Sequence, residues 1–448
     1  MAQAKKMDHI TTLVERHFNS SHDELHIEKV PVSAIVAEYG TPLYIYDRHI
    51  LDQKWTMLRD ALPPEFAISY SVKANPNRKI LRYFVSKGCG LEIASSGELH
   101  QAIEAGCPSG QIVFAGPGKT EAELEFALAQ GIGEIHVESM LEVERVNTIC
   151  RRLGVRGRIA LRINPGEEAQ GGAMRMGGKP VPFGIDEECL DVVLDRVLSK
   201  PFIEFRGIHL FVGTQILNHS ILIDQYHHGM ELARRVASRM HRPLQTVDFG
   251  GGFGIPYFAH EQELDVAAFG KGLAALMAKV KNDALFLETQ FMVEPGRFLV
   301  GESGLYLVRI NDIKVSRGKK FLIVDGGMHH HLAASGNLGQ TIKRNYPVAV
   351  LNKLNISPKE KVDVVGPLCT PLDVLARAVE LPKAEVGDLI GVFQSGAYAR
   401  TASPLGFLSH PTPPEVWVEE GRAHLIRRRG KYKDFFVDLC DLPCDKTG

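Results

Sequence analysis

The stretch Tyr70-Ser71-Val72-Lys73-Ala74-Asn75-Pro76 indicates how the rest of the chain is organised. An apolar run, 66–70, has strand character, and the Asn-Pro pair is a turn signal, so Lys73 is predicted at the C-terminal end of a strand. A lysine there is most simply a solvated charge. The other interpretation is a Schiff-base lysine, because partial desolvation at the mouth of a fold makes an amine nucleophilic. The residues at the ends of the later predicted strands decide between these two interpretations of Lys73.

Short β-rich runs alternate with helical patterns from about residue 50 onward. We predict strands at 66–72, 90–94, 112–115, 134–137, 158–163, 205–212, 246–249 and 291–293, and helices at 121–130, 141–153, 190–198, 225–240 and 266–280. Eight strands alternating with helices over about 250 residues is the pattern of an α/β fold of the TIM type, a (β/α)₈ barrel. A doubly wound sheet is the main alternative, but its dinucleotide fingerprint is missing, because Ile255 stands where a third glycine is required.

Outside the barrel the pattern changes. Predicted strands at 306–315, 320–324, 361–365, 389–393 and 415–418, without long helices between them, indicate a separate β domain. Before the barrel come helical patterns at 9–19 and 32–39 and a strand at 42–46. The segment 166–184, rich in Gly, Pro and Met, is predicted to be a mobile flap over the barrel mouth.

The composition is that of an ordinary soluble globular protein: 448 residues, 44% hydrophobic and 23% charged. A net charge of −1 gives no basic footprint for nucleic acid or an anionic membrane. Seven cysteines, an odd and scattered set, favour a reducing compartment over a disulfide framework. Cys440 and Cys444 have no second pair beside them, which argues against a metal site. Without a signal peptide core or an apolar run of ~18 residues, we expect a cytoplasmic protein.

Residues that could bind a ligand or take part in catalysis occur at the predicted C-terminal strand ends, where (β/α)₈ barrels have their active sites. They are Lys73, Glu92, Phe211, Thr214, Gly250-Gly251-Gly252, Glu294 and Arg297. A glycine triplet alone is equally a flexible turn. After the seventh strand, however, its backbone N–H groups would form a phosphate cradle, and Arg297 can add a guanidinium to the same phosphate. Glu294 is by default a solvated or salt-bridged carboxylate. If an aromatic phosphate cofactor is present, Glu294 becomes a partner for its ring nitrogen. A lysine, a phosphate cradle and a carboxylate around one mouth specify pyridoxal 5'-phosphate.

The motifs Tyr-Ser-Val-Lys-Ala-Asn at 70–75, Glu-Ile-Ala-Ser-Ser-Gly-Glu at 92–98, Gly-Gly-Gly-Phe-Gly at 250–254, Glu-Pro-Gly-Arg at 294–297, Gly-Pro-Leu-Cys-Thr at 366–370 and Gly-Ala-Tyr at 396–398 follow one another in a known order. Over nearly its whole length the chain resembles the barrel-type (fold type III) pyridoxal-phosphate decarboxylases of diaminopimelate, ornithine and arginine. The resemblance implies an alanine-racemase-like barrel at 45–304, and a β-sandwich or β-barrel domain built from 1–44 and 305–448.

The same resemblance implies a homodimer with shared active sites, in which Cys369 reaches in from the partner subunit as proton donor. Lys73, Glu92, Phe211, Thr214, the glycines 250–252, Glu294, Arg297 and Tyr398 would bind the cofactor, with Lys73, Glu294 and Cys369 catalytic. Substrate contacts would come from Asp325, His329 and Thr370.

The departures from the family pattern concern the substrate. In diaminopimelate decarboxylases an acid follows the cysteine, and an arginine in a separate stretch meets the distal carboxylate. Here Thr370 stands where the acid is expected, and His-His-His-Leu-Ala-Ala at 329–334 replaces the stretch that contains the arginine. An unpaired distal charge in a closed site costs several kcal/mol, so a free diamino acid fits poorly. The histidine that stacks on the cofactor in much of the family is Phe211.

This set of variants resembles a subgroup that includes the decarboxylase acting on glutamyl groups tethered to an acyl carrier protein in butirosin biosynthesis. We therefore expect decarboxylation of a carrier-tethered, glutamyl-like unit, or of a modified amino acid in secondary metabolism. A free diamino acid decarboxylase, an amino-acid racemase or epimerase on the same fold, and a non-catalytic cofactor carrier are the alternatives. Neighbouring residues on a strand point to opposite sides, so we expect no metal at His329-His330-His331.

Overall fold

The computed structural model describes residues 9–166, 174–175, 180–211, 213–340 and 342–440. Within them the chain separates into two compact units. One, the barrel unit, comprises residues 53–256 and 261–300, and the other, the β unit, comprises residues 9–52, 257–260 and 301–440.

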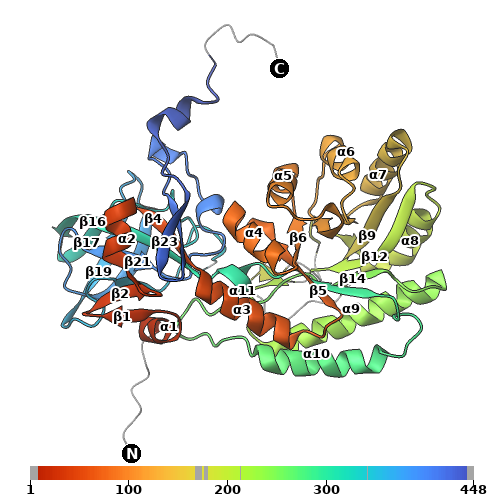
Figure 1. The fold of residues 1–448 in the computed structure, drawn as a ribbon, viewed down its shortest axis with the longest axis horizontal. Helices are drawn as coiled ribbons and strands as arrows, with labels where there is room; N and C mark the ends of the chain where they lie inside the picture. Colours follow the sequence, from red (N-terminus) through yellow and green to blue (C-terminus); the bar gives the residue numbers. More distant parts are fainter. Residues whose placement is uncertain (1–8, 167–173, 176–179, 212, 341, 441–448) are drawn as a thin grey trace, which may run out of the picture. The chain divides into compact units, whose positions relative to one another are not determined.

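Eight parallel strands form the closed barrel of the first unit (Figure 1). They are β5 (Phe66–Ser71), β6 (Gly90–Ile93), β7 (Ile112–Phe114), β8 (Glu134–Val137), β9 (Gly157–Asn164), β12 (Ile203–Leu210), β14 (Thr246–Asp248) and β15 (Gln290–Val293). The strands pair in chain order, β15 pairs with β5, and the β8–β9 pairing joins the two halves into one closed sheet. The predicted (β/α)₈ barrel is confirmed, since each of the eight predicted strands is present.

Helices alternate with the barrel strands along the chain and lie outside them (Figure 1). They are α3 (Arg48–Ala61), α4 (Arg78–Ser86), α5 (Ser96–Glu104), α6 (Glu121–Ala129), α7 (Met140–Leu153), α8 (Leu190–Leu198), α9 (His219–Met240), α10 (Val266–Val280) and the short α11 (Arg297–Val300). Side chains of Asn77, Ser95, Thr120 and Ser139 accept backbone N–H groups at the starts of α4 to α7. These caps satisfy donors that a helix start leaves free, and so they fix where each strand-to-helix loop ends.

The second unit is built on strands, as predicted. They are β16 (Gly304–Ser316), β17 (Lys319–Val324), β18 (Val348–Val350), β19 (Lys359–Val365), β20 (Val374–Pro382), β21 (Leu389–Val392), β22 (Glu415–Glu419) and β23 (Arg422–Arg427). From the N-terminal segment, β4 (Leu43–Asp47) inserts between β16 and β22, antiparallel to the first and parallel to the second. All five β4 residues are buried, so the N-terminal segment completes this sheet.

The rest of the N-terminal segment also packs in the β unit. It forms α1 (His9–His17), α2 (Val32–Tyr39) and a small antiparallel sheet of β1 (Asn19–Ser21), β2 (Glu24–Ile27) and β3 (Val30–Pro31). Leu13, Leu25 and Ile35 lie in one hydrophobic cluster with Leu305 and Leu389. This shared core ties the two ends of the chain together.

Two details differ from the expectations. The expected boundary between residues 44 and 45 falls inside β4, and the structure keeps residues up to Asp52 with the β unit, because β4 pairs there. His329–His331 do not form a strand: they lie in a turn after β17, in which the N–H groups of His330 and His331 both donate to the Gly327 carbonyl. The expectation that neighbouring side chains point to opposite sides, as in a strand, therefore does not apply to these three histidines.

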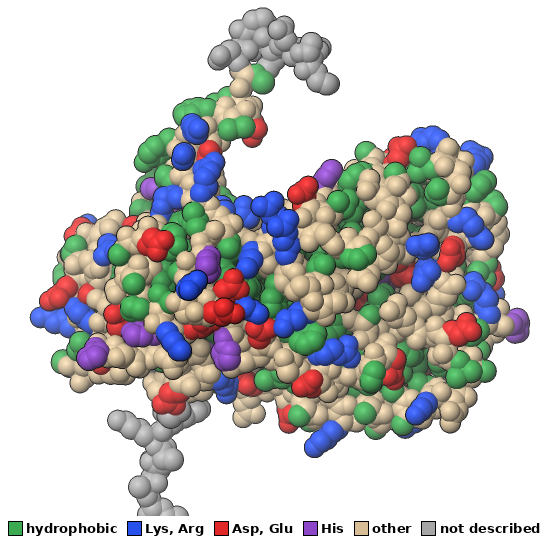
Figure 2. All heavy atoms as spheres, viewed as in Figure 1, with side chains coloured by type: hydrophobic (Ala, Val, Ile, Leu, Met, Phe, Trp, Pro, Cys, Tyr) green, Lys and Arg blue, Asp and Glu red, His purple; other side chains and the backbone are tan. Residues whose placement is uncertain are grey.

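Most of the expected flap at 166–184 lies outside the described residues. Its described parts include β10 (Met174–Arg175), which pairs with β13 (Gly213–Thr214). Directly after the expected flap, β11 (Ile185–Asp186) pairs with β9. On the face drawn in Figure 2, basic and acidic side chains are interspersed over the barrel unit. Among the described helices, none combines the length and the apolar character that crossing a membrane requires.

Candidate active site

Lys73 lies in the 3₁₀ turn η1 (Val72–Ala74), directly after β5. Its Nζ atom is 2.7 and 2.8 Å from the two carboxylate oxygens of Glu92, near the end of the neighbouring β6. The hydroxyl of Ser71 donates to the same carboxylate. Glu92 is buried, whereas the Lys73 side chain is 43% exposed. The Glu92 carboxylate thus positions the Lys73 amine, which stays accessible to solvent.

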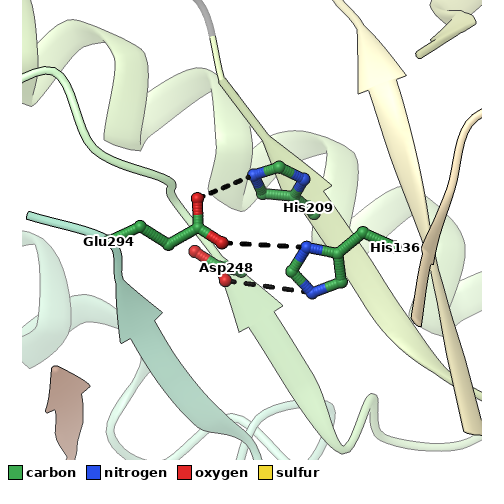
Figure 3. A group of neighbouring side chains, drawn as sticks. All are labelled: His136, His209, Asp248 and Glu294. Atoms are coloured by element: carbon green, nitrogen blue, oxygen red, sulfur yellow. Dashed lines mark ion pairs between the residues drawn. The ribbon is translucent and has the colours of Figure 1, made fainter. Parts of the chain in front are cut away.

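Glu294, just after β15, is the centre of a buried polar cluster (Figure 3). Its Oε2 atom is 3.3 Å from Nε2 of His209 on β12, and its Oε1 atom is 3.8 Å from Nδ1 of His136 on β8. The two imidazoles stack with their centroids 4.3 Å apart. Asp248, the last residue of β14, lies 3.9 Å from Nε2 of His136. Four barrel strands therefore converge on one carboxylate.

The electrostatics of this cluster keep Glu294 ionised. Burial alone would raise the pKa of Glu294, but the adjacent imidazoles of His209 and His136 and the Lys73 amine outweigh it and hold that pKa well below its usual range. Burial lowers the pKa of His209 to about 4, although the neighbouring Glu294 carboxylate opposes that shift. Burial, with Glu294 close by, raises the pKa of Asp248 well above its ordinary value.

Gly250-Gly251-Gly252 follow β14 and pass close to the ends of two other strands. A Cβ atom on Gly250 would come within 2.5 Å of the Leu210 carbonyl oxygen, and one on Gly251 within 2.6 Å of the Glu294 carbonyl oxygen. Gly250 and Gly252 also have φ angles of +65° and +103°, which favour glycine. The N–H of Gly250 donates to Asp248. Only glycine lets the backbone approach this closely, as a phosphate-binding loop requires.

The other predicted residues of the barrel unit border this loop. The Phe211 ring lies 3.1 Å from the Cβ position of Gly250, and the Arg162 guanidinium is 5.9 Å from its centroid. Thr214 is the last residue of β13. Arg297 opens α11, three residues after Glu294. The barrel thus brings the predicted lysine, glutamates and glycines to the same strand ends.

The remaining predicted residues belong to the β unit. Cys369 is exposed on the turn between β19 and β20, beside the half-buried Thr370. Tyr398 has a positive φ of 53°, which is uncommon for a bulky residue. His329 is fully buried, and neither of its ring nitrogens has a hydrogen-bond partner. Asp325 accepts hydrogen bonds from Thr41 and from the Arg309 N–H, so its contacts are made within the β unit.

Sequence reasoning missed His136 and Asp248, although both touch the Glu294 cluster. The signal for His136 was present: Glu134, His136 and Glu138 alternate with apolar residues, so in a strand they share one face. In a barrel that face is the interior, which is usually apolar. Polar residues repeated there indicate a site rather than a packed core.

The family model described as "Pyridoxal-dependent decarboxylase, pyridoxal binding domain" matches residues 48–301, more than half of the chain. The chain belongs to this family. The L-glutamyl-[BtrI acyl-carrier protein] decarboxylase of Niallia circulans is 38% identical over 413 residues, 92% of this chain and 96% of that protein. The diaminopimelate decarboxylase of Zymomonas mobilis is 30% identical over 428 residues, 94% of this chain and 98% of that protein.

Among solved structures, diaminopimelate decarboxylase from M. jannaschii in complex with L-lysine superposes with a TM-score of 0.87 at 26% identity, covering 95% of this chain and 98% of that one. The chain is therefore a pyridoxal-phosphate-dependent decarboxylase with the barrel and β domain of this family. The residues at the barrel mouth fit that cofactor: an accessible amine, a loop of glycines with no room for a Cβ, and a buried ionised carboxylate are the groups that its aldehyde, phosphate and ring nitrogen require.

Proposed function

We propose that this enzyme decarboxylates an L-amino-acid unit, glutamyl-like, that is attached to an acyl carrier protein. The observation that carries the proposal is the 38% identity, over 92% of the chain, to a decarboxylase whose substrate is glutamyl on a carrier. The composition of 329–334 supports it, because the stretch contains no arginine for a free distal carboxylate. A carrier linkage removes that charge, so no counter-ion is needed.

The residue roles belong to this proposal. Lys73 would hold the cofactor through its amine, and Glu294 would face the ring nitrogen as an ionised carboxylate. Contacts to the phosphate and the ring face are proposed for Gly250-Gly251-Gly252, Arg297, Thr214, Tyr398 and Phe211, with Glu92 holding the lysine before substrate arrives. When bound, pyridoxal phosphate supplies an electron-accepting ring that makes loss of CO₂ from Cα feasible. Cys369 then returns a proton to Cα, while the neighbouring Thr370 faces the substrate.

We also infer that the active enzyme is a homodimer in which Cys369 serves the partner subunit. The exposed position of Cys369 supports this, since a proton donor for another chain must project from its own fold. A second support is the C-terminal segment, where large apolar side chains are exposed on a single chain: Tyr432, Phe436, Val437 and Leu439. Several such side chains close together in sequence are typical of a surface that another protein covers.

The substrate is tested by presenting the purified, yellow enzyme with glutamyl-carrier, the bare carrier, free L-glutamate and free diaminopimelate. We expect CO₂ release and a change in the cofactor absorbance with the glutamyl-carrier, and kcat/KM at least ~100-fold lower with either free amino acid. Lys73→Ala serves as the inactive control and is expected to be colourless. Comparable turnover of free diaminopimelate would overturn the carrier proposal in favour of the activity named for the Zymomonas mobilis relative.

A further inference from the structure

Two neighbouring loops at the C-terminal ends of the barrel strands carry the contacts proposed for the cofactor phosphate. The segment 213–218, which follows β12, contains Thr214, and the segment 249–256, which follows β14, contains Gly250-Gly251-Gly252. Groups that bind one phosphate must all lie within hydrogen-bond distance of it. The two segments therefore have to keep a fixed position relative to each other.

Backbone hydrogen bonds join the two segments at one point. The N–H of Ile216 donates to the Gly252 carbonyl over 2.9 Å, and the N–H of Gly254 donates to the Ile216 carbonyl over 3.1 Å. These bonds form an isolated parallel bridge between Ile216 and Phe253. A single bridge fixes one residue of each segment, so the residues on either side of it depend on further contacts.

The side chain of Gln215 supplies such a contact. Its Nε2 atom donates to the Ile255 carbonyl, and its Oε1 atom accepts the Ile255 N–H over 3.2 Å. A side-chain amide offers a donor and an acceptor, so it can satisfy both backbone groups of one residue together. Ile255 is only 1% exposed, and buried backbone groups require partners inside the protein. We call these two hydrogen bonds between Gln215 and Ile255 the amide clasp.

Gln215 forms the amide clasp from a backbone conformation that side chains disfavour. Its φ angle is +62°, in the left-handed region where glycine is the usual residue. Glycine would fit that conformation but has no amide group. Residues held in this way occur often at functional sites, where the surrounding contacts maintain the strained conformation. A Cβ atom on Gly254 would come within 2.9 Å of the Gln215 carbonyl carbon, so the two backbones pass in direct contact.

We propose that Gln215 is a positioning residue whose amide clasp holds Thr214 and the glycine loop at the separation that the cofactor phosphate requires. The inference rests on the phosphate contacts proposed above for those residues. Gln215 directly follows Thr214, and Ile255 lies three residues after Gly252. The amide clasp therefore joins the two segments next to both proposed contacts, and Gln215 acts through them without touching the cofactor.

The test compares pyridoxal phosphate with pyridoxal, which lacks only the phosphate. Apo-protein, prepared with hydroxylamine and dialysis, is titrated with each ligand for wild type, Gln215→Met and Gln215→Gly. Methionine retains the length of the side chain without its hydrogen bonds, and glycine accepts the positive φ. We expect both variants to bind pyridoxal phosphate at least ~10-fold more weakly, because the two hydrogen bonds of the clasp are lost. Their affinity for pyridoxal should stay within ~2-fold of wild type, since the groups around the ring are unchanged.

A second readout is the phosphorus NMR resonance of the bound cofactor, which responds to the surroundings of the phosphate and is expected to shift in both variants. Circular dichroism checks that each protein is folded. Gln215→Gly removes the backbone strain, so it tests the same contact if Gln215→Met does not fold. Gln101→Met, at an exposed glutamine of α5, is the matched control and should leave both affinities unchanged.

The outcomes separate this inference from the proposed function. Equal weakening of both ligands in the variants would overturn the inference, because a general disturbance of the site would then explain the loss. Wild-type affinity for pyridoxal phosphate in the folded variants would also overturn it. If the wild-type protein itself bound pyridoxal as tightly as pyridoxal phosphate, the phosphate contacts proposed for the glycine loop would fail, and the inference with them.

Discussion

Asp373 shows how one buried side chain organises two functional turns of the β unit. Its carboxylate accepts the backbone N–H groups of Met328, at 2.6 Å, and Leu368, at 2.9 Å. Met328 directly precedes the His329–His331 turn, and Leu368 directly precedes Cys369. Burial raises the pKa of Asp373, while the two N–H donors oppose that rise. The exposed cysteine therefore stands on a loop whose shape depends on a residue four positions later.

Asp373→Ala should lower kcat by at least ~10-fold and leave the affinity for pyridoxal phosphate within ~2-fold of wild type. The substitution leaves two buried N–H groups without acceptors, at a cost of roughly 1–3 kcal/mol each, so the turn rearranges and Cys369 moves. Steady-state kinetics and cofactor titration measure the two effects. Asp312→Ala, at an exposed carboxylate on β16, is the control. Unchanged kcat would mean that the position of Cys369 does not limit the reaction.

At the scale of elements, the loops after the barrel strands carry the site, and their conformations are set by close backbone contacts. The loop after β14 is fastened at both sides: the Gly250 N–H donates to Asp248, and the Glu294 N–H donates to the Gly250 carbonyl over 2.7 Å. This links the glycine loop to the carboxylate after β15. A change in the loop is therefore transmitted to Glu294 as well.

Gly250→Ala is expected to weaken pyridoxal phosphate binding by at least ~10-fold. Its Cβ would meet the Leu210 carbonyl at 2.5 Å, and the φ of +65° disfavours alanine, so the loop must shift. Absorbance titration gives the affinity, and circular dichroism checks that the protein is folded. Gly110→Ala, where the added Cβ has open space, is the matched control. Wild-type affinity in Gly250→Ala would remove this loop from the cofactor site.

The His329–His331 turn makes the stability of the β unit depend on pH. Burial lowers the pKa of His329 to about 4 and that of His331 to about 3, whereas an unfolded histidine has a pKa of about 6.5. Between these values the unfolded chain binds protons that the folded chain does not. The free energy of unfolding therefore falls as the pH drops below about 6.5. Asp47, whose pKa burial raises to about 6, opposes the trend in part.

His329→Phe should reduce this dependence. From the two pKa values, His329 alone accounts for a loss of roughly 2 kcal/mol between pH 7 and pH 5, and phenylalanine cannot be protonated. Urea unfolding at the two pH values measures the difference for each protein. His424→Phe, at an exposed histidine of β23, should retain the wild-type dependence. If His329→Phe also retained it, the turn would not be the acid-sensitive element.

At the scale of the whole molecule, two units divide the proposed site residues between them. Lys73 and Glu294 belong to the barrel unit, whereas Cys369 and Tyr398 belong to the β unit. In the proposed homodimer, Cys369 acts in the site of the other chain. This arrangement predicts that two subunits inactivated by different substitutions complement each other in a mixed dimer.

Mixing Lys73→Ala subunits with Cys369→Ala subunits should restore activity, although each variant alone is inactive. In a mixed dimer one site combines an intact lysine with an intact cysteine. Random exchange makes about half of the dimers mixed, each with one good site of two, so about a quarter of wild-type activity is expected. Subunit exchange is verified with differently tagged chains. No recovery after proven exchange would contradict a cysteine donated across the dimer.

The sequence by itself determined the barrel, because alternating strands and helices form a local pattern and parallel strands bring their C-terminal ends to one edge. The same pattern predicted that Lys73, Glu92, Gly250-Gly251-Gly252 and Glu294 lie at this one edge. Only the tertiary structure decided that His136 and Asp248 surround Glu294, and that β4 lies between β16 and β22. His136 lies more than 100 positions from both Asp248 and Glu294, and β4 lies more than 100 positions from both β16 and β22. These contacts therefore depend on the closure and register of a whole sheet, which no local pattern encodes.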